Sequence, residues 1–145
     1  MIVREYKNKN GPKVRAPEEM AARFGAVITG IEDEIEREKE RFMASGLNGA
    51  NRIIYIDVVS VGTLNASLVH PREVFRRAVQ FGCSSIILGH NHPSGEPDPS
   101  AEDRAVTMQM VEAGKLMGIP ILDHVIVAGE RFFSFAKEGL IHATR

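Results

Sequence analysis

The feature that most limits the fold of this chain is an alternation of β-branched apolar runs with helical segments beyond its N-terminal third. The strand-like runs are residues 53–59, 85–88, 121–127 and 131–135. Between them, residues 71–81 and 100–117 repeat apolar side chains at helical spacing, and Gly82 and Gly118 follow where glycine commonly ends a helix. Gly129 lies between the last two runs, as in a β-hairpin. The pattern predicts a mixed α/β domain with helices packed on a small mixed β-sheet.

The N-terminal third has a different pattern. Residues 1–16 carry an excess of basic side chains and are expected to form a solvated arm, so the predicted single domain covers residues 17–145. Pro17 opens a predicted helix that Gly30 ends. Residues 31–41 contain six acidic and three basic side chains, which by themselves predict a second, solvated helix.

Composition excludes several classes of protein. A chain of 145 residues can bury a core large enough to fold without a disulfide or a structural metal. The 18 basic and 19 acidic residues nearly cancel, whereas nucleic-acid-binding modules usually carry a basic face. Cys83 is the only cysteine, which excludes an internal disulfide and a thiolate zinc site and is typical of a reducing compartment. No segment approaches the ~20 apolar residues of a membrane span and no signal peptide is recognisable, so we expect a cytoplasmic protein.

Two histidines and an aspartate follow the predicted strand at residues 85–88. His90 and His92 are two residues apart, a spacing that directs both side chains to one side of an extended backbone. Asp103 lies one turn inside the next predicted helix, behind a stiff proline-rich loop that can return the helix to the strand end. Two imidazoles and one carboxylate suit Zn²⁺ and leave a fourth position open for water, as in catalytic zinc sites. The sequence therefore predicts a zinc site at His90, His92 and Asp103.

Parts of this pattern also have structural interpretations. A His-Asn-His sequence taken alone is more often a polar turn than a ligand pair. Ser100 and Asp103 have the spacing of a helix capping box, in which each side chain accepts a hydrogen bond from the other residue's backbone N–H. His70 precedes Pro71 and is interpreted as a helix-start residue rather than a ligand. For Asp123 and His124 two alternatives stay open: orienting a ligand imidazole, or contacting neighbours within their strand.

The spacing H-x-H, seven residues, S, two residues, D resembles the JAMM (MPN-plus) metalloprotease motif. Further segments are similar to the RadC family: residues 62–67 (GTLNAS), 69–73 (VHPRE), 90–95 (HNHPSG), 99–103, 118–119 and 122–124 (LDH). The resemblance extends from about residue 40 to the C-terminus and implies a cytidine-deaminase-like JAB/MPN domain. RadC proteins often carry a helix-hairpin-helix region before this domain, and we expect none here.

The resemblance also implies roles for individual residues. His90, His92 and Asp103 correspond to the zinc ligands, and Ser100 to a donor to the developing oxyanion. An upstream glutamate acts in the family as general base and acid and stands before an aromatic residue at a strand start, which Glu40 matches by count. Because residues 43–47 are weakly apolar and the local pattern is helical, other candidates for this role stay open: Glu36, Glu38 and Asp57.

These observations predict a zinc-dependent JAMM-type hydrolase that cleaves an amide or isopeptide bond in a peptide substrate. The main alternative is a non-enzymatic, DNA-repair-associated protein of the RadC family, which the near-neutral charge disfavours. A deaminase-like attack on a nucleobase normally uses cysteine ligands, which are absent here. A homodimer is compatible with the sequence.

Overall fold

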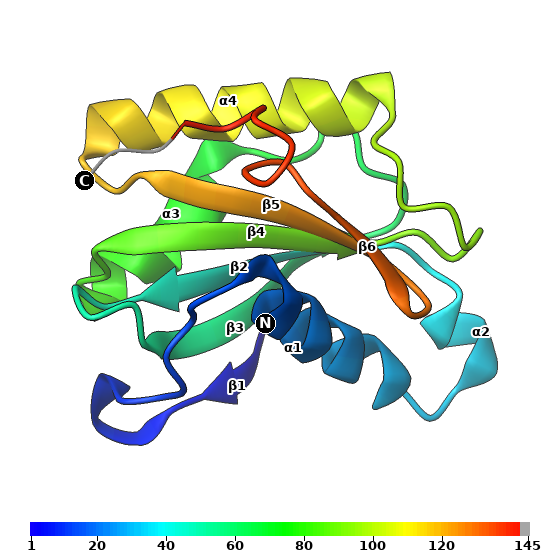
Figure 1. Ribbon diagram of the computed structural model, residues 1–145, viewed down its shortest axis with the longest axis horizontal. Helices are drawn as coiled ribbons and strands as arrows, with labels where there is room; N and C mark the ends of the chain where they lie inside the picture. Colours follow the sequence, from blue (N-terminus) through cyan, green and yellow to red (C-terminus); the bar gives the residue numbers. More distant parts are fainter. Residues whose placement is uncertain (143–145) are drawn as a thin grey trace.

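The computed structural model describes residues 1–142 as a six-stranded mixed sheet covered by helices (Figure 1). The strands are β1 (Ile2–Glu5), β2 (Arg41–Leu47), β3 (Ile53–Val61), β4 (Ser85–Asn91), β5 (Ile121–Ala128) and β6 (Arg131–Ser134). The helices are α1 (Pro17–Thr29), α2 (Glu34–Arg37), α3 (Pro71–Phe81), α4 (Ala101–Met117) and a short 3₁₀ turn, η1 (Lys7–Lys9). The expected mixed α/β architecture is confirmed. The last three residues of the expected domain, 143–145, lie outside the described residues.

The strand order is β1-β3-β2-β4-β5-β6, and only β4 and β5 run parallel. Helix α4 connects these two strands, as expected of a parallel crossover. The neighbouring strand β2 runs antiparallel to β4, with Phe42 opposite His90. The beginning of β2 therefore lies beside the end of β4.

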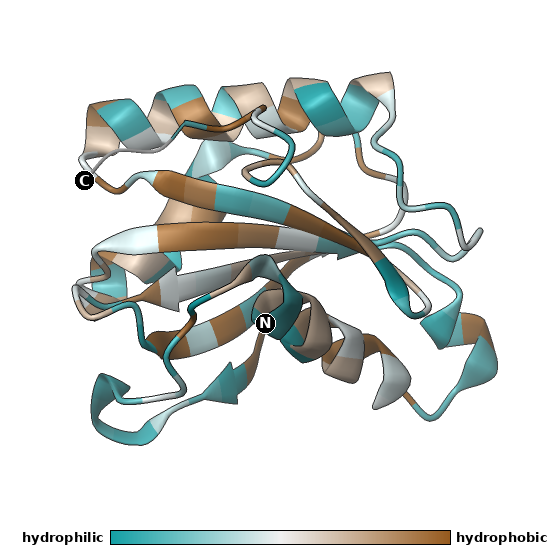
Figure 2. Cartoon of the chain, viewed as in Figure 1, coloured by the Kyte–Doolittle hydropathy of each residue, from teal (hydrophilic) through white to brown (hydrophobic). Residues whose placement is uncertain are grey.

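The sheet separates two hydrophobic cores. On one face, side chains of α3 and α4 such as Val74 and Met110 pack against Leu88 of β4. On the other face, Met20 and Phe24 of α1 pack against the sheet. Figure 2 shows that hydrophobic residues are concentrated in the central strands, whereas the helices carry hydrophobic and hydrophilic residues in turn. The side chains of β4 thus alternate between the two cores, and His90 shares the α4 face with Leu88.

The N-terminal third departs from the prediction in two places. Residues 1–16 are not a free arm, because Ile2–Glu5 pair with β3 as the edge strand β1. Residues 31–41 do not form one helix, because only Glu34–Arg37 are helical and β2 begins at Arg41.

Strand β2 lacks a strongly apolar sequence because close neighbours leave room only for small side chains in most of its second half. All seven of its residues are buried. A Cβ atom at Gly46 would collide with the sulfur of Cys83 and the ring of Tyr55. Gly89 is constrained in the same way on β4, where a Cβ atom would collide with the ring of Phe24. Close packing against neighbouring side chains therefore requires glycine in both strands.

The other expected elements agree with the structure to within a few residues. The expected strand at 85–88 continues to Asn91, so His90 lies inside β4. Two apolar residues within the predicted helices, Val79 and Met117, are about half exposed rather than buried. Cys83 is buried, as expected of a small core thiol. Within the described part of the chain, none of the helices has the length and apolar character needed to cross a membrane.

Candidate metal centre

Three predicted ligands meet where β4 ends and α4 begins, at the right-hand end of the sheet in Figure 1. His90 lies in β4, His92 follows that strand directly, and Asp103 lies in the first turn of α4. The Nε2 atoms of the two histidines are 2.9 Å apart. The carboxylate of Asp103 places Oδ1 3.1 Å from Nε2 of His90 and Oδ2 3.0 Å from Nε2 of His92. The three side chains form a group that could hold a metal ion.

The position of the ring proton on His92 indicates whether a cation fits this group. Nδ1 of His92 lies 2.8 Å from the backbone oxygen of Glu96. Because a carbonyl oxygen carries no proton, the N–H of a neutral His92 ring is on Nδ1, and Nε2 presents a lone pair. That lone pair points at Oδ2 of Asp103, which is also an acceptor. Two acceptors at this distance repel each other unless a cation lies between them, so these residues fit a metal ion.

The charges at the site favour the same conclusion. Burial opposes ionisation of Asp103, but hydrogen-bonding contacts with His90 and His92 outweigh it and hold the pKa of the carboxyl well below its usual range. The contact with Asp103 raises the pKa of His92, against the opposing effect of burial. A proton on Nε2 of His92 would occupy the position of a metal ion, so a proton and a metal ion compete for the same lone pair.

Ser100 and Asp103 also form the capping box that their spacing predicted. Oγ of Ser100 accepts a hydrogen bond from the backbone N–H of Asp103 at 3.1 Å. In return, Oδ2 of Asp103 accepts one from the backbone N–H of Ser100 at 2.8 Å. The reciprocal bonds fix the beginning of α4 and hold the Asp103 carboxylate towards the histidines. One residue thus serves both as cap and as candidate ligand.

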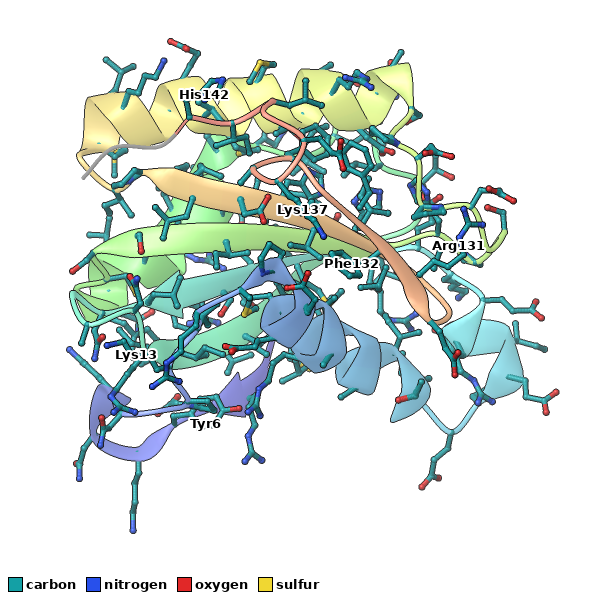
Figure 3. All side chains as sticks on the ribbon, viewed as in Figure 1. Tyr6, Lys13, Arg131, Phe132, Lys137 and His142 are labelled. Atoms are coloured by element: carbon teal, nitrogen blue, oxygen red, sulfur yellow. The ribbon has the colours of Figure 1, made fainter. Side chains whose placement is uncertain are left out.

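The loop between β4 and α4 contacts the β5–β6 hairpin through one exposed ion pair. Glu96, whose backbone oxygen contacts His92, pairs through its carboxylate with Arg131 at 3.4 Å. Arg131 is labelled in Figure 3 at the beginning of β6. Both side chains are exposed, so this pair contributes little to stability. Position of the loop therefore depends mainly on its backbone contacts and prolines.

Glu40 lies at the same end of the sheet as the histidines, because it directly precedes β2 and β2 runs antiparallel to β4. Its carboxylate is half-buried, and Oε2 accepts a hydrogen bond from the backbone N–H of Leu64 at 3.3 Å. Its negative charge contributes to the raised pKa of His92. Glu40 is therefore electrostatically coupled to the candidate ligand group.

The other three acidic candidates have different surroundings. Glu36 pairs with Lys39 at 2.7 Å and with Arg41 at 3.4 Å. Glu38 is exposed at the end of α2. Asp57 is buried in β3, 2.9 Å from the amino group of Met1.

Asn91, the middle residue of His-Asn-His, has a role that the sequence did not reveal. Its Oδ1 accepts a hydrogen bond from the backbone N–H of Arg41 at 2.7 Å. Its Nδ2 donates to the backbone oxygen of Lys39 at 3.1 Å. These two bonds bracket Glu40 and attach the beginning of β2 to the end of β4. Successive side chains of a β-strand point to opposite faces of the sheet. This rule is the one sequence signal that could have indicated that Asn91 points away from the metal group.

His70, Asp123 and His124 have different surroundings. His70 is the residue before α3 and makes no side-chain cap. Asp123 accepts hydrogen bonds from the hydroxyl of Ser134 and the backbone N–H of Ala136, and burial raises its pKa. Asp123 therefore anchors the segment after β6. The ring of His124, in contrast, contacts His90: the distance from Nε2 of His124 to Nδ1 of His90 is 2.8 Å, and burial lowers the pKa of His124 well below its usual value.

Comparison with known proteins identifies the family of this chain. The sequence model of the RadC-like JAB domain matches residues 18–140. A UPF0758 protein of Methanosarcina barkeri is 51% identical over 106 residues, covering 73% of this chain and 46% of the relative. A UPF0758 protein of Desulforamulus reducens is 43% identical over 128 residues, covering 88% of this chain and 54% of the relative. The chain thus spans about half the length of these curated relatives, and it belongs to the RadC-like JAB domain family.

Proposed function

We propose that this member of the RadC-like JAB domain family is a zinc-dependent hydrolase that cleaves an amide or isopeptide bond in a peptide. The observation that carries the proposal is the convergence of two histidine Nε2 atoms and one carboxylate at the end of β4. Glu40 at the same edge of the sheet adds an acid–base group that such a reaction requires.

The residues that would hold Zn²⁺ are His90, His92 and Asp103, through Nε2 of each ring and the carboxylate. The chemistry supplied by zinc at a site with three protein ligands is Lewis acidity, which polarises a carbonyl group and lowers the pKa of water to about 7. His90 and Asp103 are almost completely buried, whereas the side chain of His92 is 12% exposed. A substrate therefore reaches the group from the His92 side.

Glu40 is proposed to move the proton. Its carboxylate takes a proton from the attacking water as the water oxygen forms a bond to the carbonyl carbon. It then gives this proton to the amide nitrogen as the carbon–nitrogen bond breaks, so that an amine and a carboxylic acid leave. A general base and acid in this position contributes ~10²- to 10⁴-fold to the rate.

Ser100 is proposed to donate a hydrogen bond to the oxygen that becomes negative during this attack. In the capping box the hydroxyl of Ser100 acts only as an acceptor, through a lone pair on Oγ, while its backbone N–H is the donor. Its hydroxyl proton is therefore free to point towards a substrate, and capping and catalysis do not compete for it.

Two measurements on the full chain test the proposal. Zinc binding is measured for the wild type and for His92→Ala, and we expect near-stoichiometric zinc in the wild type and a strong loss in the variant. Zinc-loaded wild type and Glu40→Gln are then incubated with libraries of linear and lysine-branched isopeptides. Cleavage by the wild type alone supports the proposal. A wild type that binds no zinc, or equal cleavage by both proteins, overturns it.

A further inference from the structure

We infer that His124, held by Thr107, fixes the position of the ring proton on His90, so that His90 presents an unprotonated Nε2 to the metal group. His124 is then a positioning residue for a ligand and does not touch the metal itself. The inference rests on the proposed metal site and is independent of the proposed hydrolysis. It follows from counting the protons along a chain of four buried polar groups.

The chain begins at the backbone oxygen of Asp103. Oγ1 of Thr107 lies 2.7 Å from this oxygen, one helical turn away in α4, and 2.5 Å from Nδ1 of His124. A carbonyl oxygen carries no proton, so only the hydroxyl proton of Thr107 can occupy the first contact. With that proton used, the second contact needs a proton from the other partner. Nδ1 of His124 therefore carries its ring proton and donates to Thr107.

His124 in turn determines the position of the ring proton on His90. His124 is completely buried, and among the described residues its ring nitrogens contact only Thr107 and His90, so the ring is neutral and carries one proton. Since that proton is on Nδ1, Nε2 of His124 is an acceptor. Nε2 lies 2.8 Å from Nδ1 of His90, so the proton in this contact belongs to His90. The Nε2 atom of neutral His90 is left with a lone pair, 3.1 Å from Oδ1 of Asp103.

Aromatic neighbours keep the His124 ring from exchanging its two nitrogens. Phe135 stacks on the ring, with 4.9 Å between centroids and 7° between planes. Phe42 meets it edge-on, with centroids 5.9 Å apart at 88°. Neither phenyl ring offers a polar partner that would stabilise a flipped imidazole. The orientation of His124 is therefore fixed by packing as well as by hydrogen bonds.

The two candidate histidine ligands are thus controlled in different ways. The proton of His92 is fixed by the backbone oxygen of Glu96 in an exposed loop. That of His90 is fixed by two side chains from α4 and β5, which are buried and on the opposite side of the ring from the metal group. Partners of this kind orient a ligand ring, and their loss typically weakens metal binding 10- to 100-fold.

Removal of the Thr107 hydroxyl tests this control. In Thr107→Val the partner that fixes His124 is lost while the volume is nearly kept, so we expect zinc affinity, measured by competition with a chromophoric chelator, to fall about 10- to 100-fold. Thr107→Ser keeps the hydroxyl and should restore affinity to near the wild-type value. Ser45→Ala is the matched control, because it removes another buried hydroxyl, bonded to the backbone oxygen of Tyr55 at 3.0 Å in a central strand. Its zinc affinity should equal that of the wild type.

The ring protons can also be observed directly by ¹⁵N NMR of the imidazoles in the metal-free wild type. We expect His124 to carry its proton on Nδ1 and to have an unprotonated Nε2. A proton on Nε2 of His124 overturns the inference, as does a folded Thr107→Val variant that binds zinc as tightly as the wild type. A wild type that binds no zinc would reject the proposed function instead, and the NMR result would still decide the proton positions.

Discussion

The side chain of Asn91 holds the backbone of Glu40 from both sides. It accepts a hydrogen bond from the N–H of the residue after Glu40 and donates one to the carbonyl of the residue before it. Asn91 belongs to the same three-residue stretch as His90 and His92 but faces β2 rather than the metal group. One short segment therefore supplies both candidate metal ligands and the support of the candidate general base.

This arrangement predicts that Asn91→Ala lowers kcat but leaves zinc content unchanged. The variant removes the side-chain acceptor of the buried Arg41 N–H, which costs about 1–3 kcal/mol of stability, whereas the carbonyl of Lys39 still accepts a hydrogen bond from the Arg41 guanidinium. The measurements are turnover per folded molecule, zinc content and thermal melting. Asn91→Asp, which keeps the acceptor and loses the donor, should be intermediate. Wild-type kcat in a folded Asn91→Ala would show that Glu40 does not depend on this support.

Glu40→Gln separates the proposed general base from the candidate metal ligands. Glu40 is not among the three clustered residues, so the variant should retain zinc and its fold. Its activity should fall by ~10²- to 10⁴-fold, because an amide cannot accept the proton of the attacking water. Elemental analysis and turnover are measured on the same preparation. Loss of zinc in Glu40→Gln would mean that the carboxylate has been assigned the wrong role. Glu38→Gln is the control and should have the zinc content and turnover of the wild type.

How well each element could be predicted from the sequence depends on whether its packing allows the residue pattern that is typical of a helix or a strand. Helix α3 carries helical periodicity because one of its sides is buried, and strand β3 is recognisable as a run of large apolar side chains that are buried on both faces of the sheet. Strand β2 crosses the centre of the sheet, where Gly46 must be a glycine to fit against Cys83 and Tyr55. Such a strand loses the apolar alternation by which strands are recognised.

Some residues of the candidate site could likewise be predicted from the sequence and others could not. The spacing of His90, His92 and Asp103 was visible because a strand end and a helix start adjoin each other in the sequence. The contact between His90 and His124 depends on the parallel pairing of β4 with β5, in which Leu88 lies opposite His124. A local pattern carries no information on that register. Thr107 was invisible for the same reason, since its hydroxyl matters only through His124.

The two roles of Ser100 can be measured separately. Ser100→Ala removes the cap and the hydroxyl together, and a lost cap costs about 0.5–2 kcal/mol of stability. Ser100→Gly costs only a few tenths of a kcal/mol at such a position but equally lacks the hydroxyl. If the hydroxyl donates to the oxyanion, both variants should lose ~10²- to 10³-fold in kcat despite their different melting temperatures. Turnover that follows melting temperature would leave Ser100 as a cap alone.

Cys83 should make stability fall at alkaline pH. Burial raises the pKa of its thiol to about 11, against about 8.5 in an unfolded chain. Between these values the unfolded state releases a proton that the folded state keeps, so the free energy of unfolding decreases as pH rises through this window, by up to about 3 kcal/mol. Urea unfolding from pH 8 to pH 11 measures the slope. Cys83→Ala should have a shallower slope, and identical slopes would contradict the raised pKa.

Zinc should stabilise the folded chain, because the three clustered acceptors exist as a group only in the native state. An ion that binds only the folded state adds about 2.7 kcal/mol at a free concentration of 100 Kd. For a domain of this size that amount raises the melting temperature by roughly 5–10 °C. A chelator should reverse the shift, and Mg²⁺ should not produce it, since imidazole nitrogens favour zinc over magnesium. His92→Ala is the matched variant: it removes one ligand at the surface of the group and should abolish most of the shift. An equal zinc-induced shift in His92→Ala would place the stabilising ion elsewhere on the molecule.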